Sequence, residues 1–224
     1  MYKLLLALIA VSVCGVTAVR ADSAAAPSAP EPTTVERAQA IRFALNARSR
    51  HAGSTLLVTE ATSTAVVASF TLLTANLQET RVVPADNGIY FAICPRSAAC
   101  PYPDRRLGRP ASDFHPRRVA LELALRTFLE TSAAVVAVSL PTPRSFTVLV
   151  VEREALMRDV DIPGLVSALR RHTGHGSASW PRRIVDRVTR PLVFVFLGLE
   201  PTQGERETFT AVPRWPDLDV EDRR

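Results

Sequence analysis

The clearest chemical signal in the sequence is a pair of cysteines followed by closely spaced arginines. Cys94 and Cys100 are separated by five residues. In an oxidising compartment, two cysteines at this distance predict a disulfide bond that closes a small ring. A guanidinium group binds phosphate or carboxylate through two hydrogen bonds, so arginines in and after the ring predict an anion-recognition loop. These anion-binding candidates are Arg96, Arg105, Arg106 and Arg109.

The loop that carries these residues has prolines at positions 95, 101, 103 and 110, so it cannot form one regular helix or strand. Long irregular loops are uncommon inside compact domains and are usually functional or disordered. The alternative is a solvated, disulfide-braced connection in a chain that is rich in arginine throughout. A second local source of anion affinity is the basic cluster formed by Arg182, Arg183, Arg187 and Arg190.

The same loop also contains residue types that a hydrolase uses. Ser112, Asp113 and His115 lie within four positions, and histidine is the side chain that titrates nearest neutral pH. A secreted hydrolase with His115 as its base is therefore the alternative function. Members of a catalytic triad usually come from separate elements, and Ser112 and Asp113 are better explained as residues at the start of a helix. No G-x-S-x-G, H-E-x-x-H or phosphate-loop motif occurs.

Lysine chemistry and metal chemistry are both poorly supported by the sequence. Of the 27 basic residues, 26 are arginine, and the single lysine is Lys3. Schiff-base catalysis and a phosphate-loop lysine each need an ε-amine. His172 and His175 could offer two imidazoles to a metal, but metal sites normally need three or four ligands. We expect no metal and no cofactor.

A net charge of +5 and a pI of 9.7 suggest nucleic-acid binding as one possible function. The arginines are dispersed among 22 acidic residues, and aromatic residues make up only 6% of the chain. The protein is also predicted to leave the cytoplasm. These three observations together predict that nucleic acid is not a partner.

The N-terminus has the layout of a secretory signal peptide over residues 1–21. Lys3 precedes an apolar run over 4–19, and small residues stand at Val19 and Ala21. The alternative is an uncleaved membrane anchor, although the run is shorter than the roughly 20 residues that span a bilayer. Cleavage would leave 25 basic and 22 acidic residues, or about +3. We therefore expect an exported bacterial protein, secreted or associated with the cell envelope.

The remaining sequence predicts a single α+β domain over residues 33–213. An Ala/Pro/Ser-rich disordered tether (22–32) precedes it, and a mobile acidic tail (214–224) follows it. The first helix begins with Thr33 and Glu36 at the spacing of a capping box. Further helices are predicted at 116–131, near 162–171 and at 181–188, and strands at 55–59, 64–73, 89–94, 135–140, 145–152, 192–199 and 209–212. This irregular order predicts a largely antiparallel sheet packed by two or three helices.

Charge and hydropathy patterns make three finer predictions. The apolar segment 192–199 is expected to be a central strand covered on both sides. The segment 209–212 is expected to be an edge strand. One solvated stripe of alternating charge is predicted on the 116–131 helix, formed by Arg118, Glu122, Arg126 and Glu130.

The sequence predicts a binding or interaction protein rather than an enzyme. Its ligand is not defined beyond an anionic group that the arginine-rich disulfide loop would recognise. The expected partner is an anionic component of the envelope or another protein. A membrane is expected to be a partner only if the signal segment stays uncleaved.

Overall fold

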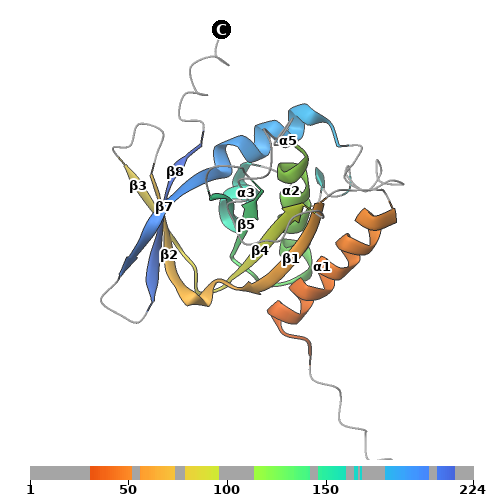
Figure 1. Cartoon of the computed structure of the whole chain (residues 1–224), viewed down its shortest axis with the longest axis horizontal. Coiled ribbons are helices and arrows are strands. Elements are labelled where there is room, and N and C mark those ends of the chain that lie inside the picture. The colour runs from red at the N-terminus through yellow and green to blue at the C-terminus, as the bar shows by residue number, and fades with distance from the viewer. Residues whose placement is uncertain are drawn as a thin grey trace, which may run out of the picture. The chain divides into compact units, whose positions relative to one another are not determined.

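The computed structural model describes residues 31–51, 56–73, 79–95, 114–141, 146–159, 164–165, 167, 180–201 and 206–214 (Figure 1). The described helices and strands all belong to one compact unit, Pro32–Arg224. The predicted signal segment lies outside the described residues, as do nearly all of the tether and the tail. In the part of the chain that the structure describes, no helix is both long enough and apolar enough to cross a membrane.

Eight strands form one mixed sheet in the order β1-β4-β5-β6-β7-β8-β2-β3. The pairs β4–β5 and β8–β2 are parallel, and the other five neighbouring pairs are antiparallel. The α+β class with a largely antiparallel sheet is therefore confirmed. The strands are β1 (Leu56–Ser63), β2 (Val67–Leu73), β3 (Thr80–Pro84), β4 (Gly88–Pro95), β5 (Val135–Leu140), β6 (Thr147–Glu152), β7 (Val193–Pro201) and β8 (Glu207–Pro213). The helices are α1 (Thr34–His51), α2 (Phe114–Glu130), α3 (Arg153–Asp159) and α5 (Arg182–Thr189).

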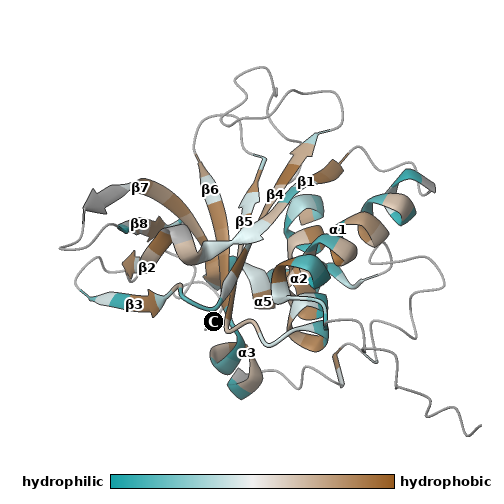
Figure 2. Ribbon diagram, turned by 90° about the horizontal axis from the view of Figure 1, so that it is seen from below, coloured by the Kyte–Doolittle hydropathy of each residue, from teal (hydrophilic) through white to brown (hydrophobic). Residues whose placement is uncertain are grey.

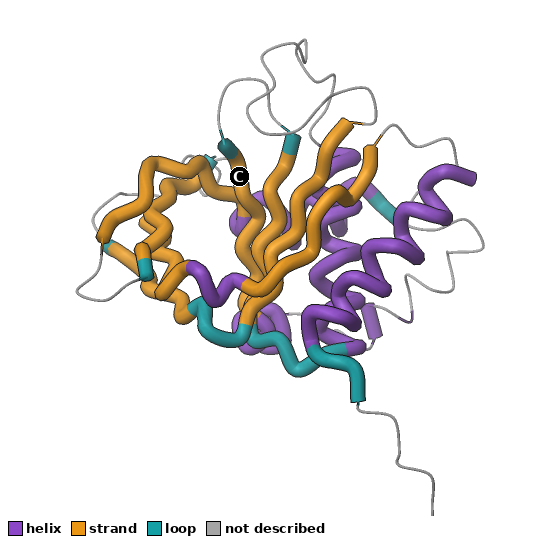
Figure 3. The backbone as a smooth tube through the Cα atoms, turned by 60° about the horizontal axis from the view of Figure 1, so that its bottom comes forward, coloured by secondary structure: helices purple, strands orange, loops and turns teal. Residues whose placement is uncertain are grey.

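The sheet bends back on itself because two long ribbons are broken near their middle. The short helix η1 (Thr64–Val66) separates β1 from β2, and residues 85–87 separate β3 from β4. At this bend the Thr64 hydroxyl donates a hydrogen bond to the Ala85 carbonyl at 2.6 Å. A side-chain carbon on Gly88 would overlap both Thr64 Oγ1 and Val135 Cγ1, so only glycine fits there. Figure 3 shows the strands curving round while the helices gather on one side.

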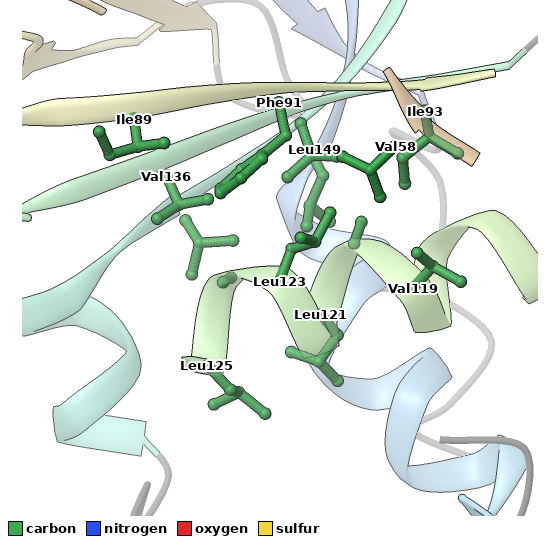
Figure 4. Close-up of a cluster of buried hydrophobic side chains, with 14 of the residues drawn as sticks. Val58, Ile89, Phe91, Ile93, Val119, Leu121, Leu123, Leu125, Val136 and Leu149 are labelled. Carbon is green, nitrogen blue, oxygen red and sulfur yellow. The ribbon is translucent and has the colours of Figure 1, made fainter. Parts of the chain in front are cut away.

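Two apolar cores lie on opposite faces of the central strands. Alternate residues of β5 and β6 supply each core: Val136 and Leu149 face the helices, whereas Ala137 and Val148 face the inside of the bend. In Figure 4 the β4 side chain of Phe91 points toward the side chains of α2. The hydrophobic colour that covers much of β6 and β7 in Figure 2 is consistent with this burial on both sides. Burial of both faces explains the nearly continuous apolar sequence of these strands.

Helix α1 covers the outer edge of the sheet. Its capping box is confirmed, because Thr33 N donates to Glu36 Oε2 at 2.6 Å and Glu36 N donates to Thr33 Oγ1 at 3.2 Å. Along the helix, the Asn46 amide both donates to the Val58 carbonyl (2.7 Å) and accepts from the Val58 N–H (2.9 Å). Arg42 adds a bond to the Thr59 carbonyl at 2.7 Å. These side chains satisfy main-chain groups of β1 that a neighbouring strand would otherwise bind.

Several predicted boundaries were wrong. The break between the first two strands lies at η1 rather than at 60–63, and β3 was missed. Strand β8 is not at an edge, because it lies between β7 and β2. Its parallel pairing with β2 joins segments far apart in sequence, which no local pattern reveals. Strand β7 is only partly covered, since Leu197 is 60% exposed beside an irregularity in the β7–β8 register.

The predicted helices 116–131 and 181–188 are confirmed as α2 and α5. Of the helix predicted near 162–171, only positions 164, 165 and 167 are described, and all three are helical. The predicted solvated stripe on α2 was wrong at Glu122, which is buried. Its carboxylate accepts from Arg48 of α1 at 2.6 Å and from Arg126 at 3.0 Å. Helix α1 therefore covers a surface that the charge pattern alone assigned to solvent.

Candidate functional site

The described residues define both ends of the predicted anion-recognition loop. The loop begins after β4, whose last two residues are Cys94 and Pro95, and Cys94 is buried with its sulfur 3.3 Å from Thr59 Oγ1. It ends at Phe114, the first residue of α2, two positions before the predicted start. The predicted partner Cys100 and the candidates Arg96, Arg105, Arg106 and Arg109 lie outside the described residues. The disulfide and the role of the loop arginines therefore remain predictions.

The end of the loop at α2 brings two basic side chains into contact. Arg118 Nη2 lies 2.6 Å from His115 Nδ1, one helical turn away. Burial lowers the pKa of His115, and the positive charge of Arg118 lowers it further. Burial also lowers the pKa of Arg118, although Glu122 partly offsets this effect. The pair is therefore an unfavourable place for a second positive charge, which favours the neutral form of the His115 ring.

Helix α5 adds arginines to the same place, and Figure 1 shows it beside α2. The Arg182 guanidinium lies 5.3 Å from the centre of the Phe114 ring, and the Arg118 guanidinium lies 5.8 Å from it. Both distances fall within the range of cation–π contacts. The Phe114 ring, at the end of the loop, therefore contacts one guanidinium group from α2 and one from α5.

A buried ion pair fixes α5 against α2. The Arg117 side chain is only 1% exposed, and it donates to Asp186 Oδ1 at 2.6 Å and to Thr189 Oγ1 at 2.7 Å. Asp186 also lies 3.7 Å from Arg182 and 3.6 Å from Arg190. One carboxylate is therefore shared by three guanidinium groups, which leaves a surplus of positive charge around it.

We call the surface formed by these groups the α2–α5 basic surface. Arg182, with its side chain 64% exposed, is its most accessible member among the residues that contact Asp186. The first turn of α2 contains no acidic residue. Contacts join His115, Arg118, Arg182 and Arg190 in this surface, and we include Arg183 and Arg187 as the other exposed arginines of α5.

The sequence predicted the part of this surface that lies on α5. The arginine cluster of α5 was predicted from its spacing, but its neighbours on α2 were assigned to other roles. Arg118 was placed on a solvated stripe, and His115 was considered only as a base. The missing information was that α5 packs beside the start of α2, which depends on the buried Arg117 and its contact with Asp186.

The geometry around His115 does not resemble that of a catalytic base. In a triad, a carboxylate accepts a hydrogen bond from Nδ1–H and leaves Nε2 to take up a proton. Here a guanidinium, which can only donate, contacts Nδ1, so the neutral ring carries its proton on Nε2. Ser112 and Asp113 fall in the part of the chain that the structure does not describe. The hydrolase alternative therefore gains no support from the described residues.

Metal binding gains no support either. Among the described residues, no group of three or more histidine, cysteine or acidic side chains could hold a metal ion. His172 and His175 lie outside this part of the chain, so the prediction about them is untested.

The chain has no match among protein-family models, curated proteins or solved structures. Its function has to be inferred from its own residues and their geometry.

Proposed function

We propose that this protein is an exported binding protein that recognises an anionic group on the α2–α5 basic surface. The arginine-rich loop between Cys94 and Phe114 would contribute further guanidinium groups. The proposal depends mainly on one observation, the 2.6 Å contact between Arg118 and His115. This contact places a guanidinium and an imidazole side by side near the start of α2, where both can donate hydrogen bonds to an anion.

The arrangement of the surface supports this proposal in two further ways. Arg118 and Arg182 approach the Phe114 ring from different helices, so an anion near that ring would meet donors on two rigid elements. The start of α2 also carries the positive end of the helix dipole, which attracts anions. A phosphate or carboxylate at this position would accept hydrogen bonds from guanidinium groups and lower the repulsion among them.

The proposal is tested by measuring binding of inorganic polyphosphate and of polyglutamate at low salt. The double variant Arg182→Ala/Arg187→Ala is expected to bind the preferred polymer about ten-fold more weakly, which equals roughly 1.4 kcal/mol. The matched control is Arg50→Ala/Arg158→Ala, which removes the same charge from exposed positions on α1 and α3. Comparison of the two polymers separates phosphate recognition from carboxylate recognition.

Equal losses in the two double variants would overturn the proposal, because binding would then depend on net charge alone. The loop is tested separately with Arg105→Ala/Arg106→Ala. A further loss of affinity would place the loop in the site, and unchanged affinity would restrict the site to α2 and α5.

A further inference from the structure

The C-terminal segment of the chain carries the charge that the α2–α5 basic surface lacks. Four of the six residues from 217 to 222 are acidic: Asp217, Asp219, Glu221 and Asp222. Leu218 and Val220 alternate with them. On α5 the charges have the opposite sign, because four arginines lie between positions 182 and 190 and Asp186 is the only acid among them.

The described chain ends beside this surface. Arg214 N donates to the Val193 carbonyl at 3.0 Å, which fixes the last described residue next to the start of β7. Val193 directly follows the short helix η3 (Arg190–Leu192), which continues α5. The last described residue therefore lies close to the C-terminal end of the arginine cluster, three positions before Asp217 in the sequence.

The segment is also long enough to reach along α5. Eight extended residues, 215–222, span about 26 Å. Helix α5 has eight residues and is about 12 Å long. Exposed apolar surface is present as well, since Ile184 is 40% exposed among the arginines. Acids alternating with Leu218 and Val220 match a surface on which arginines surround an apolar side chain.

We propose that the chain's own residues 215–222 bind the α2–α5 basic surface and compete there with external anions. The inference rests on the proposed function, because it takes this surface as the anion site. A tethered segment has an effective concentration in the millimolar range, so even weak contacts would keep the site partly occupied. An external anion would then have to displace the segment, and its apparent affinity would be lower than its intrinsic affinity.

The first test uses the full-length protein with a neutralised tail, Asp217→Asn/Asp219→Asn/Glu221→Gln/Asp222→Asn. This variant is expected to bind polyphosphate or polyglutamate three-fold to ten-fold more tightly than the unchanged protein at low salt. The difference should disappear at about 1 M salt, where charges more than about 3 Å apart are screened. Equal affinities at low salt would overturn the proposal.

The second test measures the contact directly. A fluorescently labelled peptide of residues 215–224 is titrated with the tail-neutral protein, and binding is followed by anisotropy. Binding should weaken about ten-fold when Arg182→Ala/Arg187→Ala is added and should not change with Arg50→Ala/Arg158→Ala. A peptide with the four acids replaced by amides should not bind. Binding that both double variants weaken equally would mean that the peptide follows net charge alone.

The two tests separate the two proposals. If polyphosphate binds at α5 but the peptide does not, the tail proposal fails and the proposed function stands. If a labelled acidic peptide of unrelated sequence binds more tightly than residues 215–224, the surface serves an external protein segment instead, and the tail proposal fails. If neither polymer nor peptide distinguishes the α5 variant from its control, both proposals fail.

Discussion

The two ends of helix α2 are both surrounded by arginine side chains, but the contacts differ in kind. At the C-terminal end, Arg153 donates to three main-chain carbonyls, those of Phe128 (2.6 Å), Thr131 (2.7 Å) and Ala133 (2.7 Å). Arg37 of α1 donates to a fourth, that of Glu130, at 3.2 Å. Cations at this end also complement the negative end of the helix dipole.

At the N-terminal end, the same residue type is in a less favourable position. His115 and Arg117 lie in the first turn, where the helix dipole is positive, and Arg118 directly follows them. Arg117 is buried and lies 2.6 Å from the Asp186 carboxylate. Arg118 instead contacts His115, another basic group.

This difference separates arginines that hold the fold from arginines that are available to a ligand. Arg153 and Arg117 direct their donors to oxygen atoms of neighbouring elements, so their loss should lower stability. Arg182, which is exposed, and Arg118 add positive charge close to the His115 ring at the start of α2. Their substitution should change anion binding more than it changes the free energy of unfolding.

The largest expected effect is that of Arg117→Met, which removes the buried cation between α2 and α5. It should lower the free energy of unfolding by about 3 kcal/mol, because breaking a buried ion pair leaves a carboxylate without its closest partner. Arg182 and Arg190 remain near Asp186 and limit the loss. Denaturation in urea measures the change.

The matched control is Arg182→Gln, since Arg182 contacts the same carboxylate from an exposed position. Its unfolding free energy should change by less than about 0.5 kcal/mol. If the two variants lost equal stability, the distinction between the two classes of arginine would be wrong at this end of the helix.

Local patterns in the sequence predicted the elements whose partners lie nearby. The Thr33–Glu36 capping box involves residues three apart, and strand β5 was predicted with its exact bounds. Strands β5 and β6, which pair with each other, were predicted at 135–140 and 145–152, only a few residues apart. In each case the deciding interactions are close in sequence, so composition and spacing contain the information.

The interactions that place the candidate site are distant in sequence. Arg117 meets Asp186 and Thr189 about 70 residues later, as their sequence separations of 69 and 72 show. Arginine is usually exposed, so nothing in the sequence around Arg117 indicated that it would be buried. Nothing in the sequence around Arg153 indicated that its donors would cap the end of α2.

The second prediction concerns that C-terminal end. Arg153→Gln should lower the free energy of unfolding by about 2 kcal/mol, because three carbonyls lose a charged donor and only part of that loss is recovered by water. Arg158→Gln is the matched control, since Arg158 is exposed on the same helix, α3, and should change stability by less than about 0.5 kcal/mol. A value for Arg153→Gln as small as that of the control would show that the three hydrogen bonds contribute little.

The smallest effect is a pH dependence at the N-terminal end. The pKa of His115 is lowered in the folded protein from the usual value of about 6.5, so the unfolded chain takes up this proton more readily. The contribution of His115 to the free energy of unfolding is therefore at its full value above about pH 6.5. It declines as the pH falls from there through the lowered pKa of the folded protein. Arg118→Gln removes the cation that contributes to the shift, but not the burial that contributes most.

The His115 pKa should therefore rise in Arg118→Gln while staying below about 6.5, and the acid-induced loss of stability should become smaller. Polyphosphate should also raise this pKa in the unchanged protein, because a bound anion stabilises the protonated ring. Titration of the His115 ring signals by NMR measures both changes. A His115 pKa that did not respond to Arg118→Gln would show that the two basic groups are not electrostatically coupled, and the N-terminal end of α2 would then offer an anion no more than its exposed arginines do.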